Sequence, residues 1–350
     1  MWKSTVRILV FSERLAPPPD EGIKKLALSL AAALRGLGHD VLTLTTGGAD
    51  WPEMAVVNLQ ADRLLRSDAL AERSAVFSPD VVLYVPTASL TLASGLRARM
   101  LKRHARGAAV ALIATQGRRH TPGVRLAARL IGPDLCVVQS RHTESQARSL
   151  GWRTVLLPPG VDLVAFQPVP LEEKRRLRRA HDLPEEAMIV LHVGHLNRQR
   201  GVAGLKALAG LALPVLTAST TTAQDVVLAA ELRAAGVHLI THYVSQVSEL
   251  YQAADIYLFP VPPNPDAPSS IDWPLSVLEA AACDLPILAT RFGALPEVWS
   301  DRAGVAFYDD EASLRAGLVH LREHPAHTRP LAEPFSWENM ARRILAEIPR

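Results

Sequence analysis

Short apolar runs alternate with amphipathic segments along most of this 350-residue chain, and this alternation limits the fold more than any other feature. In the first half the runs fall at 6–11, 41–45, 81–85, 109–114 and 135–139. In the second half they fall at 188–193, 214–218, 237–241, 256–260 and 286–290. Most runs are continuous rather than alternating, which is typical of parallel strands covered on both faces.

The segments between these runs carry apolar residues at helical spacing. The clearest examples are 22–37, 90–106, 223–235, 246–254 and 311–324. Strand and helix alternating throughout predict an α/β architecture with parallel sheets. Because 48% of the residues are apolar and 21% are charged, the composition is that of a globular protein and not of a disordered one.

The pattern breaks near 158–187, where prolines and a glycine interrupt it before a charged helix. We therefore expect two Rossmann-like, doubly wound domains facing a cleft, one over 1–168 and one over 169–335. Ser336 is the predicted N-cap of a closing helix over 336–350. The carboxyl ends of both sheets should line the cleft, where open α/β sheets bind their ligands.

Several functional classes are disfavoured. The two cysteines, Cys136 and Cys283, lie far apart and suggest buried, reduced thiols in a cytoplasmic protein. No metal-binding motif is present, and no apolar run reaches the length of a membrane span. No Gly-x-Gly-x-x-Gly follows a strand, which disfavours a dinucleotide-dependent oxidoreductase. Basic and aromatic residues are not interleaved, which disfavours nucleic-acid binding.

Positive charge is concentrated in one stretch. No acid occurs between Asp80 and Asp134, whereas nine basic residues do. Four of them are spaced to share one face of a predicted helix: Arg99, Lys102, Arg103 and Arg106. Such a stripe suits an anionic membrane surface, which predicts peripheral association at the inner face of the membrane. A solvated helix face is the alternative.

The segment 269–290 has the pattern of a nucleotide site. A polar loop leads into a short helix, whose first N–H groups can bind an anion. Glu279, one turn into that helix, can accept hydrogen bonds from the vicinal hydroxyls of a ribose. The candidate donor-binding residues of this segment are Ser270, Ile271, Asp272, Pro274, Leu275, Ser276 and Glu279.

Two further glycine-bearing loops follow strands. Gly194 ends the run 188–193, and the next residues include His195, Arg198 and Arg200. Both arginines carry planar guanidinium groups suited to a diphosphate, and a helix is expected to begin at Gly201. The other loop follows the run 6–11 and ends at Gly22, a further candidate donor-binding residue.

Taken in order, these motifs resemble the retaining GT-B glycosyltransferases of glycosyl transferases group 1, a family-4-like group. That family carries Glu-Gly-Phe-Gly, four residues, then Glu-Ala and a Gly-x-Pro turn. Glu279 matches the second Glu, but Ile271 stands where the first is expected, with Asp272 one residue off register. His195 and Arg200 stand at the family's Arg and Lys positions in the second-domain loop.

The resemblance implies an enzyme that transfers a hexosyl-type sugar from a nucleotide-diphosphate sugar to a hydroxyl of a glycan or lipid-linked acceptor. Retention of configuration and independence of metal are implied as well, with no cofactor beyond the donor. The acceptor would belong to domain 1–168 and the donor to 169–335, while 336–350 would pack back on the first domain. Base, sugar, acceptor and oligomeric state stay open.

The catalytic residue also stays open. Family members often carry a His after the fifth strand; here Gln116 occupies that position, and His120 lies four residues later. These two are the weak catalytic candidates. The loss of that His and the presence of Ile271 leave a second hypothesis, a weakened or inactive GT-B protein that binds a nucleotide sugar or a partner transferase.

Overall fold

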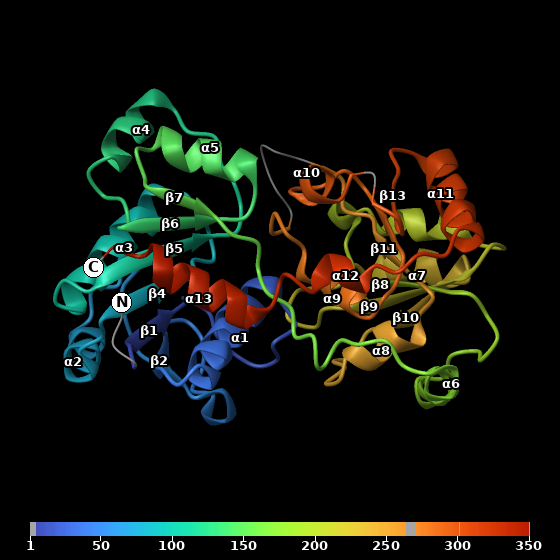
Figure 1. Cartoon of the computed structure of the whole chain (residues 1–350), viewed down its shortest axis with the longest axis horizontal. Coiled ribbons are helices and arrows are strands. Elements are labelled where there is room, and N and C mark those ends of the chain that lie inside the picture. Colours follow the sequence, from blue (N-terminus) through green and yellow to red (C-terminus); the bar gives the residue numbers. More distant parts are fainter. Residues whose placement is uncertain (1–4, 264–269, 301, 350) are drawn as a thin grey trace. The chain divides into compact units, whose positions relative to one another are not determined.

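The computed structural model describes residues 5–263, 270–300 and 302–349, and the chain divides into two compact units (Figure 1). The first unit comprises Met1–Gly160, Pro265–Trp273 and Trp337–Arg350, and the second comprises Val161–Asn264 and Pro274–Ser336. The division thus falls after Gly160, whereas the sequence analysis placed it after residue 168. It also assigns a short piece between the two parts of the second unit to the first.

The first unit is built on a parallel sheet whose order among the described residues is β3-β2-β1-β4-β5-β6-β7. The strands are β1 (Arg7–Phe11), β2 (Asp40–Thr45), β3 (Val56–Asn58), β4 (Val81–Tyr84), β5 (Ala109–Ala114), β6 (Leu135–Val138) and β7 (Thr154–Leu156). The five expected strands are present. The additional ones, β3 and β7, are three-residue strands at the two edges of the sheet.

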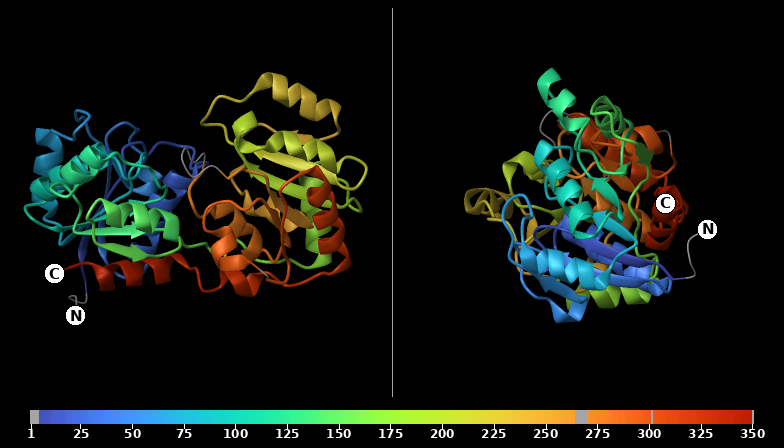
Figure 2. Two further views of the ribbon diagram at one scale, coloured as in Figure 1. Left: turned by 90° about the horizontal axis from the view of Figure 1, so that it is seen from above. Right: turned by 90° about the vertical axis from the view of Figure 1, so that its left-hand side faces the viewer.

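Helices cover both faces of this sheet. They are α1 (Gly22–Gly36), η1 (Pro52–Met54, a 3₁₀ turn), α2 (Asp68–Phe77), α3 (Leu92–His104), α4 (Pro122–Ala128), α5 (Arg141–Ser149) and α13 (Trp337–Glu347). The last of these lies beside α1 (Figures 1 and 2) and adds Met340, Ile344 and Leu345 to the apolar core under that helix. A second core on the other face is built around Leu9, Leu112 and Trp152.

The second unit repeats the architecture with the strand order β10-β9-β8-β11-β12-β13. Its strands are β8 (Ile189–Gly194), β9 (Leu213–Ala218), β10 (His238–Ile240), β11 (Ile256–Phe259), β12 (Ile287–Ala289) and β13 (Val305–Phe307). Its helices are α6 (Leu171–Ala180), η2 (Arg198–Arg200), η3 (Val202–Leu208), α7 (Val226–Ala234), α8 (Ser248–Ala253), α9 (Leu275–Ala282), α10 (Leu295–Trp299), α11 (Glu311–Glu323) and α12 (Arg329–Ala332). All described strand pairs in both sheets are parallel, and the expected pair of doubly wound α/β domains is confirmed.

A helix follows Gly201 as expected: it is the 3₁₀ helix η3, and Gly201 is its N-cap residue. One local expectation was wrong. The predicted helix 90–106 ends at His104, and Arg106 lies beyond it with a positive φ of 50°. The four basic residues of the expected stripe therefore do not share one helix face.

Two members of that stripe also have partners in the first unit. Arg99 donates a hydrogen bond to the carbonyl of Leu130, and Lys102 pairs with Asp134 at 2.5 Å. Among the described residues, no helix is both long enough and apolar enough to cross a membrane.

Candidate functional site

In the second unit, the candidate residues follow two adjacent strands. Gly194 is the last residue of β8, and α9 begins after the loop that leaves β11. Strands β8 and β11 are hydrogen-bonded neighbours. Because the carboxyl ends of parallel strands share one edge of a sheet, both segments lie at the carboxyl edge of this unit, which is where open α/β sheets commonly bind ligands.

The segment 194–201, here called the β8 loop, is shaped by close backbone contacts. Asn197 caps η2 by accepting a hydrogen bond from the backbone N–H of Arg200 at 3.1 Å. Gly201 has a φ of +69°, and a Cβ there would lie 2.0 Å from the carbonyl oxygen of Pro260. A Cβ on Gly194 would lie 2.7 Å from Nε2 of His192. Gly201 therefore needs glycine, which can adopt a positive φ without a side chain, whereas a side chain at position 194 would displace His192.

The two arginines of the β8 loop differ in their surroundings. Arg198 is exposed and pairs with Glu231 and, at 3.7 Å, with Asp225. The hydrogen bond to Glu231, followed by the charge of that carboxylate, raises the pKa of Arg198. Arg198 is thus engaged with α7. Arg200 is half-buried and lies close enough to His192 to lower the pKa of that imidazole.

His195, at the family's Arg position, is half-buried. Its Nδ1 lies 3.0 Å from the hydroxyl oxygen of Thr222. A neutral imidazole can donate or accept here, so His195 can serve as a polar ligand without a permanent charge.

A buried histidine that the sequence analysis did not identify lies under the β8 loop. His192 is on β8, and its Nδ1 is 3.0 Å from the carbonyl oxygen of Leu258 on β11. Its Nε2 has no hydrogen-bond partner among the described residues. Burial lowers the pKa of His192 to about 4, and the nearby Arg200 lowers it further, while the bond to Leu258 opposes the shift. The imidazole is therefore neutral at ordinary pH.

The first turn of α9 supplies the second half of the site. Pro274 is the N-cap residue, and Leu275 and Ser276 open the helix. Glu279 is only 6% exposed and accepts a hydrogen bond from the hydroxyl of Tyr251 at 2.8 Å. Tyr251 lies on α8 and is fully buried. Glu279 is therefore a nearly buried carboxylate whose orientation is restrained by a hydrogen bond, and not a mobile surface acid.

The candidates Ser270, Ile271 and Asp272 belong to the first unit, whereas Glu279 belongs to the second. Asp272 accepts hydrogen bonds from Ser140, at 2.6 Å, and from Thr143, at the N-terminus of α5. Its backbone N–H donates to the carbonyl of Thr115 at 2.8 Å. The Asp272 carboxylate already has two hydroxyl donors, which is what a buried charge requires.

The other first-unit candidates lie around the same segment. A Cβ on Gly22 would lie 3.2 Å from the Ile271 side chain, so these two residues are in contact. The Gln116 amide donates to the Ser270 carbonyl at 3.0 Å. Gln116 therefore holds the segment in place, and a carboxamide has no basic nitrogen for proton transfer.

His120, the other weak catalytic candidate, is half-buried, and its Nε2 has no hydrogen-bond partner among the described residues. Burial lowers the pKa of His120, and the charges of Arg125 and Arg118 lower it further. The imidazole is therefore unprotonated near neutral pH, as a proton acceptor must be.

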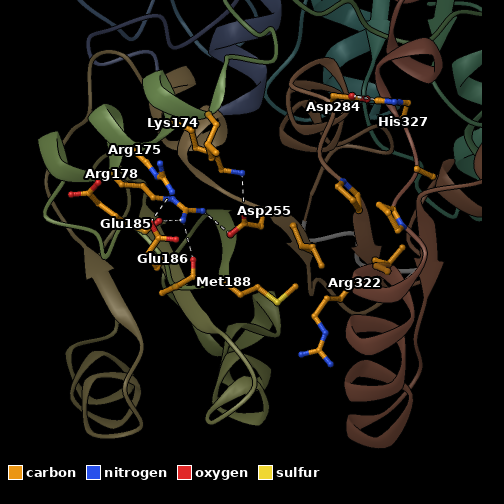
Figure 3. A pocket seen from close by; sticks show the side chains of 17 residues that line it. Lys174, Arg175, Arg178, Glu185, Glu186, Met188, Asp255, Asp284, Arg322 and His327 are labelled. Atoms are coloured by element: carbon orange, nitrogen blue, oxygen red, sulfur yellow. Dashed lines mark hydrogen bonds and ion pairs between the residues drawn. The ribbon is translucent and has the colours of Figure 1, made fainter.

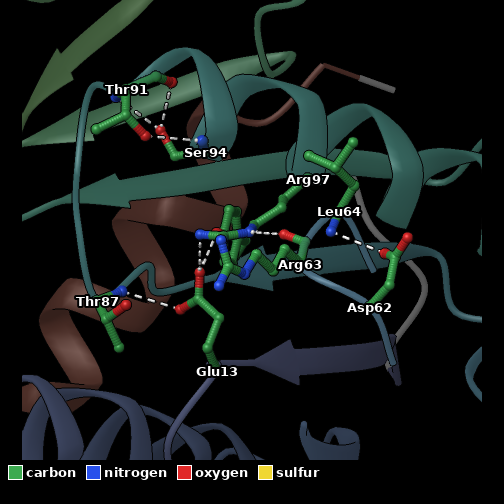
Figure 4. Close-up of polar contacts among 9 residues, drawn as sticks. Glu13, Asp62, Arg63, Leu64, Thr87, Thr91, Ser94 and Arg97 are labelled. Atoms are coloured by element: carbon green, nitrogen blue, oxygen red, sulfur yellow. Dashed lines mark hydrogen bonds and ion pairs between the residues drawn. The ribbon is translucent and has the colours of Figure 1, made fainter. Parts of the chain in front are cut away.

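A buried polar cluster at the carboxyl edge of the first sheet was also missed (Figure 4). Glu13, which follows β1, accepts hydrogen bonds from the Tyr84 hydroxyl, from the Thr87 backbone at 2.9 Å and from Arg97 at 3.0 Å. Burial raises the pKa of Tyr84, and the Glu13 charge raises it further. Because each of these polar groups is partnered, the cluster braces this edge of the sheet.

A cavity of 720 Å³ lies at the opposite edge of the second sheet, next to the residues that precede β8, β11 and β12 (Figure 3). Several of the charges that line it are paired with one another. Asp255 accepts from Lys174 at 2.6 Å and from Arg178 at 2.7 Å, and Arg175 pairs with Glu186 at 3.0 Å. These pairs join α6 to the sheet, so we assign this cavity a structural role and not that of the candidate site.

The comparisons with known proteins begin with a family match in the second half of the chain. Residues 189–324 match the sequence model of the family described as Glycosyl transferases group 1. A D-inositol 3-phosphate glycosyltransferase of Geodermatophilus obscurus is 28% identical over 63% of this chain and 54% of its own length. A GDP-mannose-dependent alpha-(1-6)-phosphatidylinositol dimannoside mannosyltransferase of Mycobacterium tuberculosis is 29% identical over 56% and 52%. The chain spans about half the length of the curated relatives it matches.

Solved structures resemble nearly the whole chain. Sucrose-phosphate synthase from Thermosynechococcus elongatus has a TM-score of 0.73 at 18% identity, covering 98% of both chains. A glycosyltransferase from Rickettsia africae ESF-5 has a TM-score of 0.76 at 14% identity, covering 97% of both. Anabaena Alr3699/HepE, solved with UDP-glucose, has a TM-score of 0.72 at 14% identity, covering 97% of this chain and 99% of its own. At these identities the likeness concerns the fold.

Proposed function

We propose that this chain, which has the GT-B fold and a glycosyl transferases group 1 domain in its second unit, transfers a hexosyl group from a nucleotide-diphosphate sugar to an acceptor hydroxyl. One observation carries the proposal: the β8 loop with Arg200 and the helix α9 with Glu279 follow adjacent strands of one sheet. A cation and a carboxylate at one sheet edge suit the diphosphate and the ribose of one ligand.

The leaving diphosphate needs positive charge. We assign that role to Arg200, to the amide groups of η2 and to the N-terminus of α9, with His195 as a further polar contact. Preorganised donors of this kind stabilise charge that develops in the transition state. The proposal includes reaction without a metal at the diphosphate, since these groups would supply the charge that a divalent cation supplies elsewhere.

We propose retention of configuration on the strength of the family resemblance. Gln116 cannot act as a general base near neutral pH. In a front-face transfer the leaving phosphate itself can accept the acceptor proton, so the missing His does not exclude turnover. The Ile271 side chain takes the place of a carboxylate that would contact the donor sugar, which predicts a looser preference among hexoses.

The names of the similar proteins guide the choice of donor and acceptor. One relative is named for GDP-mannose and phosphatidylinositol dimannoside, another for inositol 3-phosphate, and one solved structure contains UDP-glucose. We therefore propose a UDP- or GDP-hexose as donor and a polyol or glycan hydroxyl as acceptor, with the donor held by the second unit and the acceptor by the first.

The test is a screen of radiolabelled UDP- and GDP-hexoses with the purified chain, read by thermal shift, donor hydrolysis and transfer to polyol and glycolipid acceptors. We expect stabilisation by one donor together with slow hydrolysis and transfer. Stabilisation without hydrolysis or transfer would favour the alternative, a GT-B protein that only binds the nucleotide sugar. No stabilisation by any nucleotide sugar would overturn the proposal.

We further propose that contact with anionic lipid, if the acceptor is membrane-borne, runs through α4 and the turn that follows it rather than through the expected α3 stripe. Leu126 and Leu130 are 68% and 75% exposed, and Arg125 and Arg129 are exposed between and beside them. Exposed leucines with flanking arginines suit an anionic bilayer surface. In liposome flotation at low salt, Leu126→Ser with Leu130→Ser should abolish binding, whereas Val76→Ser, at a 72% exposed position on α2, should not.

A further inference from the structure

Two fully buried tyrosines lie beneath the candidate donor site. Tyr251 is on α8 and Tyr257 is on β11. Their rings are stacked, with centroids 5.6 Å apart and planes 25° apart. The pair is therefore one packed unit within the second domain, formed by residues from a helix and from the strand beside β8.

The two hydroxyls are hydrogen-bonded to each other, and each has further partners of its own. Tyr251 donates to Oε2 of Glu279 at 2.8 Å. The Tyr257 hydroxyl lies 3.5 Å from the carbonyl oxygen of Val193, the residue before Gly194, and forms a hydrogen bond with the side chain of Ser276. One tyrosine therefore contacts the middle of α9, and the other links the first turn of α9 to the end of β8.

Packing alone does not explain these hydroxyls. Phenylalanine would fill the same space and form the same stack, without a buried polar group that needs a partner. Burial raises the pKa of both tyrosines well above the usual value, and the Glu279 charge raises both further, so each phenol keeps its proton as a donor. The feature that tyrosine adds at both positions is a fixed donor directed at a proposed donor-binding element.

We propose that Tyr251 and Tyr257 are positioning residues for donor binding. Tyr251 fixes the Glu279 carboxylate in the orientation that meets the ribose hydroxyls. Tyr257 fixes the start of α9 against the end of β8, where the diphosphate binds. The proposal rests on the proposed function and deepens it, because it assigns each tyrosine to a different part of the same nucleotide.

The division of roles gives a test that a merely structural tyrosine would not pass. Affinity is measured by calorimetry for UDP and GDP and for their 2′,3′-dideoxy analogues, which lack the ribose hydroxyls. We expect Tyr251→Phe to lower the affinity for the ribose-bearing nucleotide about three- to tenfold and to leave the affinity for the dideoxy analogue unchanged. We expect Tyr257→Phe to lower the affinity for the two nucleotides by the same factor, because both nucleotides carry the diphosphate.

Tyr308→Phe is the matched control. Tyr308 is a buried tyrosine of the same unit, and it follows the edge strand β13. It should change neither affinity. If Tyr251→Phe does not fold, Glu279→Gln provides the same comparison, because it removes the charged group that Tyr251 holds. If both fold, the double variant should lose no more affinity than Glu279→Gln alone.

If Tyr251→Phe lowers the affinity for the ribose-bearing and the dideoxy nucleotide equally, the positioning role of Tyr251 is overturned. It is also overturned if Glu279→Gln changes the two affinities equally. A loss confined to the ribose-bearing nucleotide in Tyr257→Phe would overturn the assignment of that residue to the diphosphate. If the unsubstituted chain binds neither UDP nor GDP, the proposed function itself fails, and the positioning proposal fails with it.

Discussion

The hydroxyl of Tyr251 and Oε2 of Glu279 are 2.8 Å apart inside the second unit. The tyrosine is fully buried and the carboxylate is nearly so. A buried carboxylate needs at least one donor, and Tyr251 supplies it in the absence of a ligand. Ribose hydroxyls would therefore add hydrogen bonds to an acid that is already oriented, which reduces the entropy lost on binding.

Glu279→Gln should weaken nucleoside diphosphate binding about tenfold, or about 1.4 kcal/mol, because the amide keeps the shape of the side chain but loses the charge-assisted bonds. Calorimetry with the donor identified by thermal shift would measure the change. Glu323→Gln, at an exposed position on α11, is the control and should have no effect. Unchanged affinity in Glu279→Gln would refute the ribose role.

Gly201→Ala should distort the β8 loop. The new Cβ would lie 2.0 Å from the Pro260 carbonyl oxygen, and the residue has a φ of +69°. We expect the free energy of unfolding to fall by about 2–4 kcal/mol and nucleotide affinity to fall with it. Gly210→Ala is the matched control, because Gly210 also has a positive φ but no atom near the added Cβ. Denaturant unfolding of the two variants separates the clash from the strain, and equal losses would contradict the prediction.

His192 should make the second unit less stable in mild acid. Its pKa is about 4 in the folded state, below the ordinary histidine value of 6.5, chiefly because burial disfavours the charged form. As pH falls from about 6.5 towards 4, the unfolded chain binds a proton that the folded chain does not, so the free energy of unfolding falls by up to about 3 kcal/mol. Above pH 6.5, the pKa of this histidine in the unfolded chain, the imidazole is neutral in both states and the loss of stability is absent.

Urea unfolding between pH 7 and pH 5 checks this prediction. In His192→Asn, whose amide can still donate to the Leu258 carbonyl, the dependence of stability on pH should be flatter. His39 and His120 also have lowered pKa values, each chiefly because of burial. They contribute to the dependence of stability on pH equally in the unsubstituted chain and in His192→Asn. An identical slope in the variant would show that His192 does not titrate in this way.

Asp255→Asn should destabilise the second unit without a direct effect on donor binding. Asp255 accepts from Lys174, from Arg178 and from the backbone N–H of Ile189 at 2.7 Å. Arg178 is 5% exposed, and loss of the charge would leave its guanidinium buried without a counterion, at a cost of about 3 kcal/mol. Thermal unfolding measures the loss. Glu173→Gln, which breaks the exposed pair with Arg176 on α6, should leave the melting temperature unchanged.

The central strands could be predicted from sequence because most are continuous apolar runs of four to six residues, such as β5 and β11. Strands β3, β7 and β13 were missed; each has three residues. Strands β10 and β12 are equally short but lie within the longer apolar runs 237–241 and 286–290. The order of strands depends on pairing between distant segments, so the sequence pattern predicted an α/β class without predicting which strands are neighbours.

The candidate site shows the same limit. Gly194, Gly201 and Glu279 follow strands or open helices, so local pattern identified them. The bond from Tyr251 to Glu279 joins residues 28 positions apart, and Asp272 meets Ser140 across 132 positions. No local signal marks either contact. Only the fold brings the hydroxyl donors Ser140 and Thr143, at the start of α5, to the Asp272 carboxylate.

The packing of α13 beside α1 has a consequence for synthesis. Strands β1 to β7 of the first unit precede residue 160, but Met340, Ile344 and Leu345 belong to its core. At ribosomal rates of about 5–20 residues per second, the apolar side of α1 waits on the order of ten to forty seconds for that helix. Throughout this interval the nascent chain exposes an unfinished apolar surface, so aggregation and chaperone capture should concentrate there, before translation of the second unit is complete.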